Sequence, residues 1–137
     1  MAISYTNVTY DNVLDSLHTI INDEFKIPLH YDEHKGPQSF LLEIQENTLD
    51  EMLANGQQRD YTVMISFNKN KEGNKTKQDV EDIGVVVEKL KRLLFNNRNY
   101  SPSGSYKFHN GEITDVVYDD NLTAEVTFNC QVLEIYN

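Results

Sequence analysis

The stretch Leu122-Thr-Ala-Glu-Val-Thr-Phe-Asn-Cys-Gln-Val132 alternates apolar and polar side chains along its whole length. Successive side chains of a β-strand point to opposite faces, so this pattern predicts a strand with one buried and one wet face. The stretch Tyr61-Thr-Val-Met-Ile-Ser-Phe67 alternates in the same way. We expect both to be strands of one sheet, with the last strand extending from Leu122 to Tyr136.

Weaker signals predict further strands around these two. Phe40, Leu42 and Ile44 alternate with Leu41, Glu43 and Gln45, which predicts a strand. Ile27–Tyr31 is suited to a short edge strand because Pro28 cannot donate to a central ladder. The polar stretch Glu46–Gln58 is compatible with a loop containing one helical turn, or with part of a hairpin. Turns and strands near the end of the chain are predicted as follows: a short strand at Tyr106 and Phe108, a hairpin turn at Asn110-Gly111, a return strand Ile113–Tyr118 and a tight turn at Asp119-Asp120-Asn121.

Two segments have helical periodicity. Apolar residues recur at helical spacing over Asp11–Phe25, and Pro28 stops this helix. The second helix is predicted to open at Thr76, with Asp79 three residues later, and to end at Asn96–Asn97. Strands joined by short turns pair antiparallel. The fold class is therefore α+β: a single domain, residues 1–137, with a single mostly antiparallel β-sheet and two α-helices packed on one face.

Composition narrows the classes of function. The chain has 137 residues, a formal net charge of −10 and one cysteine, Cys130, which we expect to be a buried structural thiol. We expect no membrane partner, because no apolar run is long enough to cross a bilayer, and synthesis in a cytosol-like compartment. The acidity argues against specific nucleic-acid binding. The one basic cluster has two readings, a cationic last turn of a helix or a phosphate site, and comprises Lys89, Lys91, Arg92 and Arg98.

No arrangement of residues predicts catalysis. His30 and His34 are four apart, which makes a metal-binding face on a helix, but Pro28 and Gly36-Pro37 favour two solvated loop histidines instead. Nucleophile-elbow, phosphate-loop and dinucleotide motifs are absent from the sequence. Two clusters of carboxylates could in principle supply an acid–base pair, but the first is better explained as a negative first turn of a helix and the second as turn residues. They are Asp79, Glu81 and Asp82, and then Asp119 and Asp120. We therefore expect no catalytic residue, no cofactor and no metal, and a protein that is not an enzyme.

The order of elements resembles the tail terminator, or tail completion, proteins of long-tailed bacteriophages. The resemblance spans nearly the full chain and is an overall pattern of elements. It is carried by Ile20-Ile-Asn-Asp-Glu-Phe25, His30-Tyr-Asp-Glu-His-Lys-Gly-Pro-Gln-Ser-Phe40, Arg59-Asp-Tyr-Thr-Val-Met-Ile-Ser-Phe67, Lys89-Leu-Lys-Arg-Leu-Leu-Phe-Asn-Asn97 and the Leu122–Val132 strand.

This resemblance implies a structural virion protein, made in the host cytoplasm and located at the tail and neck. Its implied partners are further copies of itself in a homo-hexameric ring, the tail tube protein, and a neck or head-completion protein. The ring would stop tube polymerisation at the head-proximal end and join tail to neck. DNA would pass through an acidic lumen that repels it.

Two other functions stay open. One is another neck or head-completion connector protein, and the other is a small enzyme or ligand-binding domain with an unrecognised cleft. For an assembly role, the two polar segments Glu46–Gln58 and Asn68–Lys75 are longer than tight turns require, so we predict contacts there. The candidate interface residues are Glu46, Asp50, Glu51, Asn55, Arg59, Lys69, Lys71 and Lys75.

Overall fold

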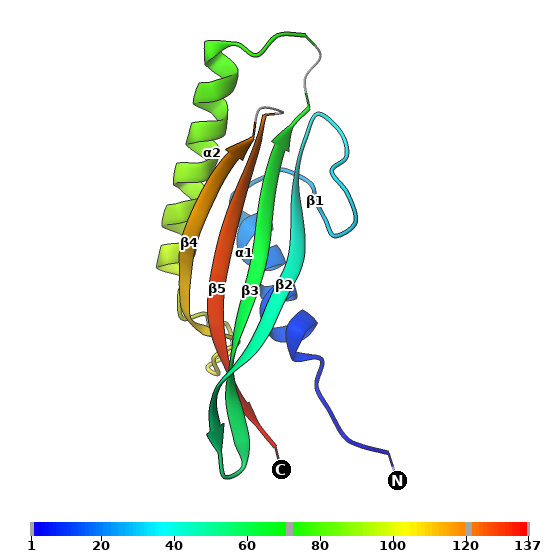
Figure 1. Cartoon of the computed structure of the whole chain (residues 1–137), viewed down its shortest axis with the longest axis vertical. Coiled ribbons are helices and arrows are strands. Elements are labelled where there is room, and N and C mark those ends of the chain that lie inside the picture. The colour runs from blue at the N-terminus through cyan, green and yellow to red at the C-terminus, as the bar shows by residue number, and fades with distance from the viewer. Residues whose placement is uncertain (1, 71–72, 120–121, 137) are drawn as a thin grey trace.

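A single five-stranded open sheet forms the body of the protein in the computed structural model, which describes residues 2–70, 73–119 and 122–136 (Figure 1). The strands lie in the order β1-β2-β3-β5-β4. Their bounds are β1 Leu29–His30, β2 Gln38–Leu53, β3 Gly56–Lys69, β4 His109–Asp119 and β5 Thr123–Ile135. The predicted α+β class is confirmed.

All neighbouring strands pair antiparallel except β1, which runs parallel to β2. The predicted edge strand near Ile27–Tyr31 is therefore present but short, because only Leu29 and His30 pair with Phe40 and Leu41. Beyond these two pairs, β2 is itself an edge of the sheet.

The polar segment Glu46–Gln58 is part of a long hairpin, which confirms one of its two predicted interpretations. Strand β2 continues to Leu53, and β3 begins at Gly56 directly opposite it. The register shifts between Ile44 and Glu46 and again between Leu49 and Glu51. Each shift is a bulge, which adds one residue to β2 and interrupts its period of two.

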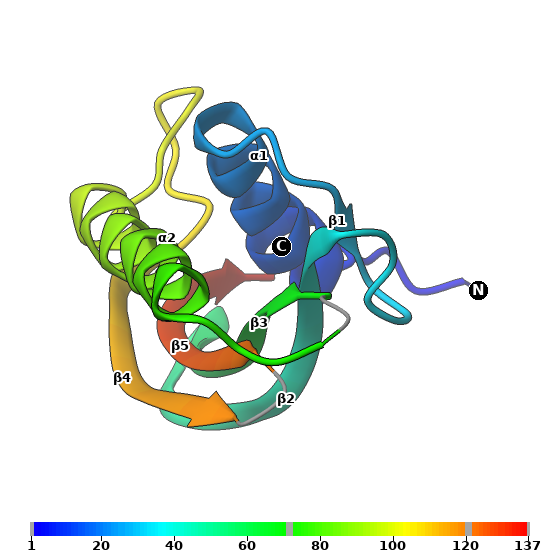
Figure 2. The same ribbon diagram turned by 90° about the horizontal axis from the view of Figure 1, so that it is seen from above.

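Two helical regions accompany the sheet. The first begins with a turn of π-helix, η1 Thr9–Leu14, and continues as α1 Asp15–Glu24. The second is α2 Lys77–Asn96. Thr76 caps α2 as predicted, since its hydroxyl accepts from the Asp79 backbone N–H and the Asp79 carboxylate accepts from the Thr76 N–H. Figure 2, seen from above, shows both helices in the hollow of the curved sheet.

The core lies between the sheet and the helices. Strand β5 contributes Ala124, Val126, Phe128, Cys130 and Val132, all buried, which is the alternation that the sequence predicts. Burial raises the pKa of the Cys130 thiol to about 12, so the expectation of a buried structural cysteine is confirmed. Helix α2 adds a buried stripe with helical spacing, formed by Ile83, Val87, Leu90 and Leu94.

The predicted hairpin at Asn110-Gly111 is wrong, because both residues lie inside the continuous strand β4. Asn110 has a φ of 52° and marks a bulge, where the ladder between β4 and β5 shifts register. The Gly111 N–H donates to the Arg98 carbonyl, and a side chain at Gly111 would meet the ring of Phe128. The Asn-Gly pair therefore joins β4 to the segment that follows α2. The predicted turn at Asp119-Asp120-Asn121 lies largely outside the described residues.

Candidate assembly surface

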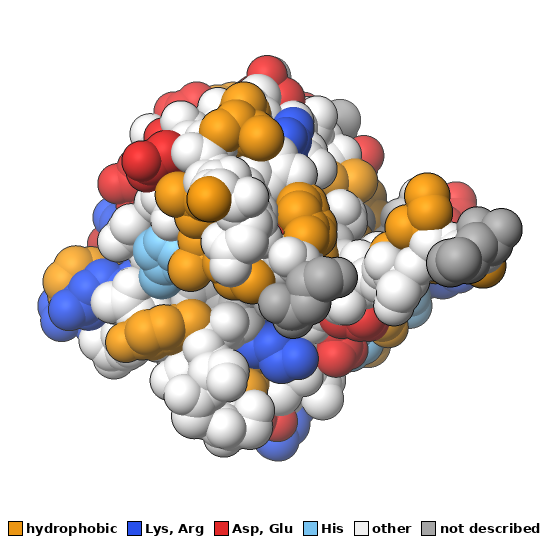
Figure 3. Space-filling view, turned by 90° about the horizontal axis from the view of Figure 1, so that it is seen from below, with side chains coloured by type: hydrophobic (Ala, Val, Ile, Leu, Met, Phe, Trp, Pro, Cys, Tyr) orange, Lys and Arg blue, Asp and Glu red, His pale blue; other side chains and the backbone are white. Residues whose placement is uncertain are grey.

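The β2–β3 hairpin extends past the helices as a projecting arm, which we define as residues 43–60 together with the end of β5 that pairs with it. Burial along β2 stops at Leu42, and from Glu43 to Asn55 every side chain is exposed except that of Leu53, which is half-buried. The hairpin tip forms the lower end of the molecule in Figure 1. Figure 3 looks onto this end and shows hydrophobic side chains gathered over the middle of the face.

The arm is an ordered structure held by β5. Gly56 pairs with Ile135, and the Tyr136 N–H donates to the Asn55 carbonyl over 2.6 Å. Arg59 donates through Nε to Asn47 Oδ1 and through Nη1 to Gln57 Oε1, each over 2.7 Å. These bonds join all three strands of the arm and give its surface a defined shape.

The two faces of the arm differ in chemistry. Ile44, Leu49 and Met52 lie opposite Val63, Arg59 and Gln57, on the face that is buried farther up the sheet. Their side chains are 41%, 49% and 66% exposed, because no helix covers the sheet at this level. The other face carries acidic side chains at Glu43, Glu46 and Glu51. An ordered strand with exposed apolar side chains on one face is typical of a protein contact surface.

Amide side chains link the strands across the acidic face. Gln58 donates to Asp50 Oδ2 over 2.8 Å, and its Oε1 lies 3.1 Å from His109 Nε2. A parallel row runs from Asn110 through Gln131 to Asp60, with distances of 2.7 and 2.8 Å. These rows hold the edge strands β2 and β4 in register with the middle of the sheet.

The structure divides the predicted interface residues into two groups. Five of them lie together on the arm: Glu46, Asp50, Glu51, Asn55 and Arg59. Lys69 and Lys75 lie at the other end of β3, near the start of α2, and Lys71 is outside the described residues. The interface hypothesis therefore keeps one continuous surface, the arm.

Lys69 has a structural contact of its own. Its Nζ lies 3.0 Å from Asp79 Oδ1 and 2.6 Å from Asp82 Oδ2, so it ties the end of β3 to the first turn of α2. The hydrogen bonds that the Lys69 ammonium donates to these carboxylates raise its pKa, and the bond to Asp82 has the larger effect. The bond to Lys69 also lowers the pKa of Asp82.

The basic cluster lies on the exposed side of α2 and just after it. We define the basic segment as residues 88–98, which hold four cations and one carboxylate. The predicted cationic last turn is wrong as stated, because the last turn of α2 has no basic residue. Arg98, beyond the helix, takes that role: its Nη1 donates to the Phe95 carbonyl over 2.8 Å, and its guanidinium lies over the Phe95 ring.

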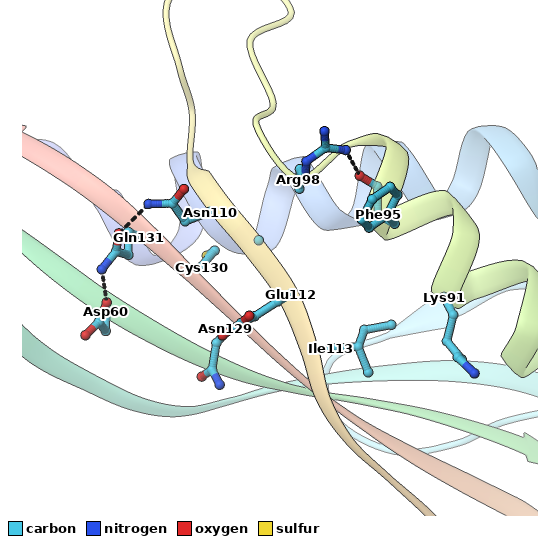
Figure 4. A pocket seen from close by; sticks show the side chains of 11 residues that line it. Asp60, Lys91, Phe95, Arg98, Asn110, Glu112, Ile113, Asn129, Cys130 and Gln131 are labelled. Atoms are coloured by element: carbon cyan, nitrogen blue, oxygen red, sulfur yellow. Dashed lines mark hydrogen bonds between the residues drawn. The ribbon is translucent and has the colours of Figure 1, made fainter.

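A hollow of about 810 Å³ lies between the end of α2 and the bulge of β4 (Figure 4). Lys91, Phe95 and Arg98 border it on the helix side, and Glu112 and Asn129 are among its residues on the sheet side. Cations and carboxylates both line it, so it favours no single charge of ligand.

His30 and His34 were expected to be solvated loop histidines, but neither is fully exposed. His34 is half-buried: its Nδ1 lies 2.7 Å from Ser39 Oγ, and its Nε2 is buried without a hydrogen-bond partner. Burial lowers the pKa of His34. His30 is also half-buried, on β1. Within residues 2–70, 73–119 and 122–136, no three His, Cys, Asp or Glu side chains are grouped so that they could hold a metal ion.

The apolar side chains of these surfaces, Leu49, Met52 and Phe95, are missing from the predicted interface residues. A signal for the first two exists, since Leu49, Met52 and Leu53 interrupt an otherwise polar stretch. Phe95 lies beside the apolar stripe of α2 and is 58% exposed. Its exposure depends on which side of α2 faces the sheet, and the spacing of apolar residues does not define the edge of that side closely enough to show it.

The chain matches no protein-family model, and no curated protein matches it in sequence. No helix in the described part of the chain has the length and apolar character needed to cross a membrane.

Proposed function

We propose that this chain is a structural virion protein that forms a ring at the head-proximal end of a phage tail tube. The ring stops polymerisation of the tube and joins the tail to the neck. The single observation that carries this proposal is the ordered arm, whose apolar side chains Ile44, Leu49 and Met52 are exposed beyond the core.

The energetics of burial support a contact role for the arm. Leaving a large aliphatic side chain in water forgoes about 1.5–3 kcal/mol relative to burying it. The arm nevertheless keeps three such groups on a strand that is fixed by its bonds to β3 and β5. These residues are about half exposed, so a second protein surface that covers them recovers part of this free energy, and a rigid arm loses little conformational entropy on binding.

The negative charge of the chain supports a ring through which DNA passes. The formal net charge is −10, and residues 43–53 of β2 alone carry four carboxylates. Phosphates are repelled by such a surface, so DNA would pass through a lumen of this kind without binding. If basic substitutions on the pore wall left DNA passage unchanged, repulsion would be the wrong explanation for the acidity.

Polymerisation of tail tubes in vitro tests the proposal. The tail tube protein of the same virus is polymerised with and without the purified chain, and tube lengths and gold-labelled copies are recorded by electron microscopy. We expect tubes that stop growing, with label at the one end that faces the head. In intact virions, label only on the head side of the head–tail joint would identify a neck or head-completion protein instead. Unchanged tubes without label would overturn the proposal.

A further inference from the structure

We infer that the arm of one copy docks onto the basic segment of α2 in a second copy, so that the ring is built from head-to-tail contacts between two unlike surfaces of this chain. This inference rests on the proposed ring, and it adds the contact surfaces and their order. Its basis is the complementary charge and the shared apolar character of the two surfaces.

The two surfaces carry opposite charge. Residues 43–53 of β2 contain four carboxylates and no Lys or Arg, whereas residues 88–98 contain four of the chain's twelve cations and a single Glu. Two of these cations already pair with neighbouring carboxylates: Lys91 with Glu88 at 3.0 Å, and Lys89 with Glu24 at 3.2 Å. These pairs are exposed and therefore weak, and Arg92 is exposed as well. The segment remains a cationic surface on an acidic protein.

Both surfaces also expose apolar groups. Along α2, Val85, Arg92 and Phe95 lie on one outward stripe, and Val85 and Phe95 are 60% and 58% exposed. On the arm, Leu49 and Met52 border the same open edge of β2 as Glu46 and Glu51. Charge complementarity selects the partner and its orientation, while covering apolar groups supplies much of the affinity.

The positions of the surfaces suit a chain of copies. Helix α2 packs mainly against β4, at one edge of the sheet, and β2 forms the opposite edge beyond its short pairing with β1. A contact between unlike surfaces at opposite edges leaves the pair of copies with one free surface of each kind, so that further copies can add at either end. Such heterologous contacts produce rings when the rotation between copies closes.

Direct pairing of sheet edges is disfavoured by the same charges. The free edge strand β4 carries Glu112, Asp115 and Asp119 and has no Lys or Arg, so it would meet the acidic β2 of a neighbour. Like charges across a strand pair are destabilising, and bulges in both strands disturb the ladder further. The basic segment is therefore the better partner for the arm.

Charge reversal with full-length protein tests the inference. The acidic-arm variant is Glu46→Lys with Glu51→Lys, and the basic-segment variant is Lys91→Glu with Arg92→Glu. All four side chains are exposed, so both variants should keep the wild-type circular dichroism and urea midpoint. Each variant alone should need at least a tenfold higher protein concentration than the wild type to assemble. An equimolar mixture should restore it, because each pair of reversed side chains then faces side chains of the opposite sign on the other variant.

A matched control separates specific contacts from net charge. Asp23→Lys with Glu33→Lys makes the same change in net charge as the acidic-arm variant, at exposed positions elsewhere, and it should assemble like the wild type. The inference is overturned if either reversed variant assembles normally, or if the mixture stays dissociated. In both cases a wild-type ring would leave the proposed function standing. A wild-type protein that never forms a ring would instead remove the proposed function itself.

Discussion

Gly56, the first residue of β3, lies so close to the backbone of Glu134 that a side chain at Gly56 would collide with the Glu134 carbonyl oxygen. The contact occurs where β5 passes the base of the hairpin tip, beside the pairing of Gly56 with Ile135. The close approach lets the end of the chain support the arm, and it requires a residue without a Cβ at position 56.

Gly56→Ala should therefore weaken the arm without unfolding the core. The added methyl must push β5 away from β3, at a cost of about 1–3 kcal/mol for an overpacked site. Hydrogen exchange should become faster at the amides of residues 53–58 and 133–136 and stay unchanged in residues 61–67. Gly84→Ala is the matched control, because a Cβ there meets nothing within 4 Å. Within helix α2 it should stabilise the protein by about 0.5–1 kcal/mol. Equal exchange rates in wild type and Gly56→Ala would contradict this account of the arm.

Lys69→Met should destabilise the fold by about 1–3 kcal/mol, because it removes the cation that pairs with the buried carboxylate of Asp79. Urea denaturation at pH 7 measures the change. The control is Lys35→Met, which breaks an exposed pair with Asp32 and should change the urea midpoint far less. Equal losses in the two variants would show that Lys69 does not fix the start of α2 to the sheet.

His34 should make the protein less stable in mild acid. Its pKa is lowered by burial, so below its ordinary pKa of 6.5 the unfolded chain binds the proton more readily than the folded protein. The free energy of unfolding should fall as the pH decreases from 6.5 toward the lower pKa of the folded state. His34→Gln, which does not titrate, should reduce this fall, as measured by urea denaturation between pH 7.5 and 5. An identical pH dependence in the variant and the wild type would contradict an imidazole whose partial burial favours its neutral form.

The parts of the fold that were predictable are those in which local pattern and tertiary packing agree. Strands β3 and β5 alternate because each has one buried face, and α2 shows both its apolar stripe and its Thr76 cap. The outer half of β2 was ambiguous for a physical reason. Two bulges break its period, and its hydrogen bonds are supplied by β3, so its own side chains give little sign of a strand.

The candidate site was predictable in part. The polarity of the arm residues Glu46 and Glu51 was enough to predict that they lie at the surface. Lys69 is equally polar, yet its side chain pairs with Asp79 and Asp82 within the fold. Asn110-Gly111 was misread for a related reason: an Asn-Gly pair permits a positive φ, and both a hairpin turn and a bulge use that freedom. Only the tertiary contacts of Gly111 with Arg98 and Phe128 distinguish the two.

The molar mass of the purified wild-type protein in solution tests the central claim most directly. Light scattering after size-exclusion chromatography, repeated over rising protein concentration, should show a closed species of fixed mass, six times that of the 15.9 kDa chain. A mass of 15.9 kDa that persists at the highest concentration would contradict assembly through the arm.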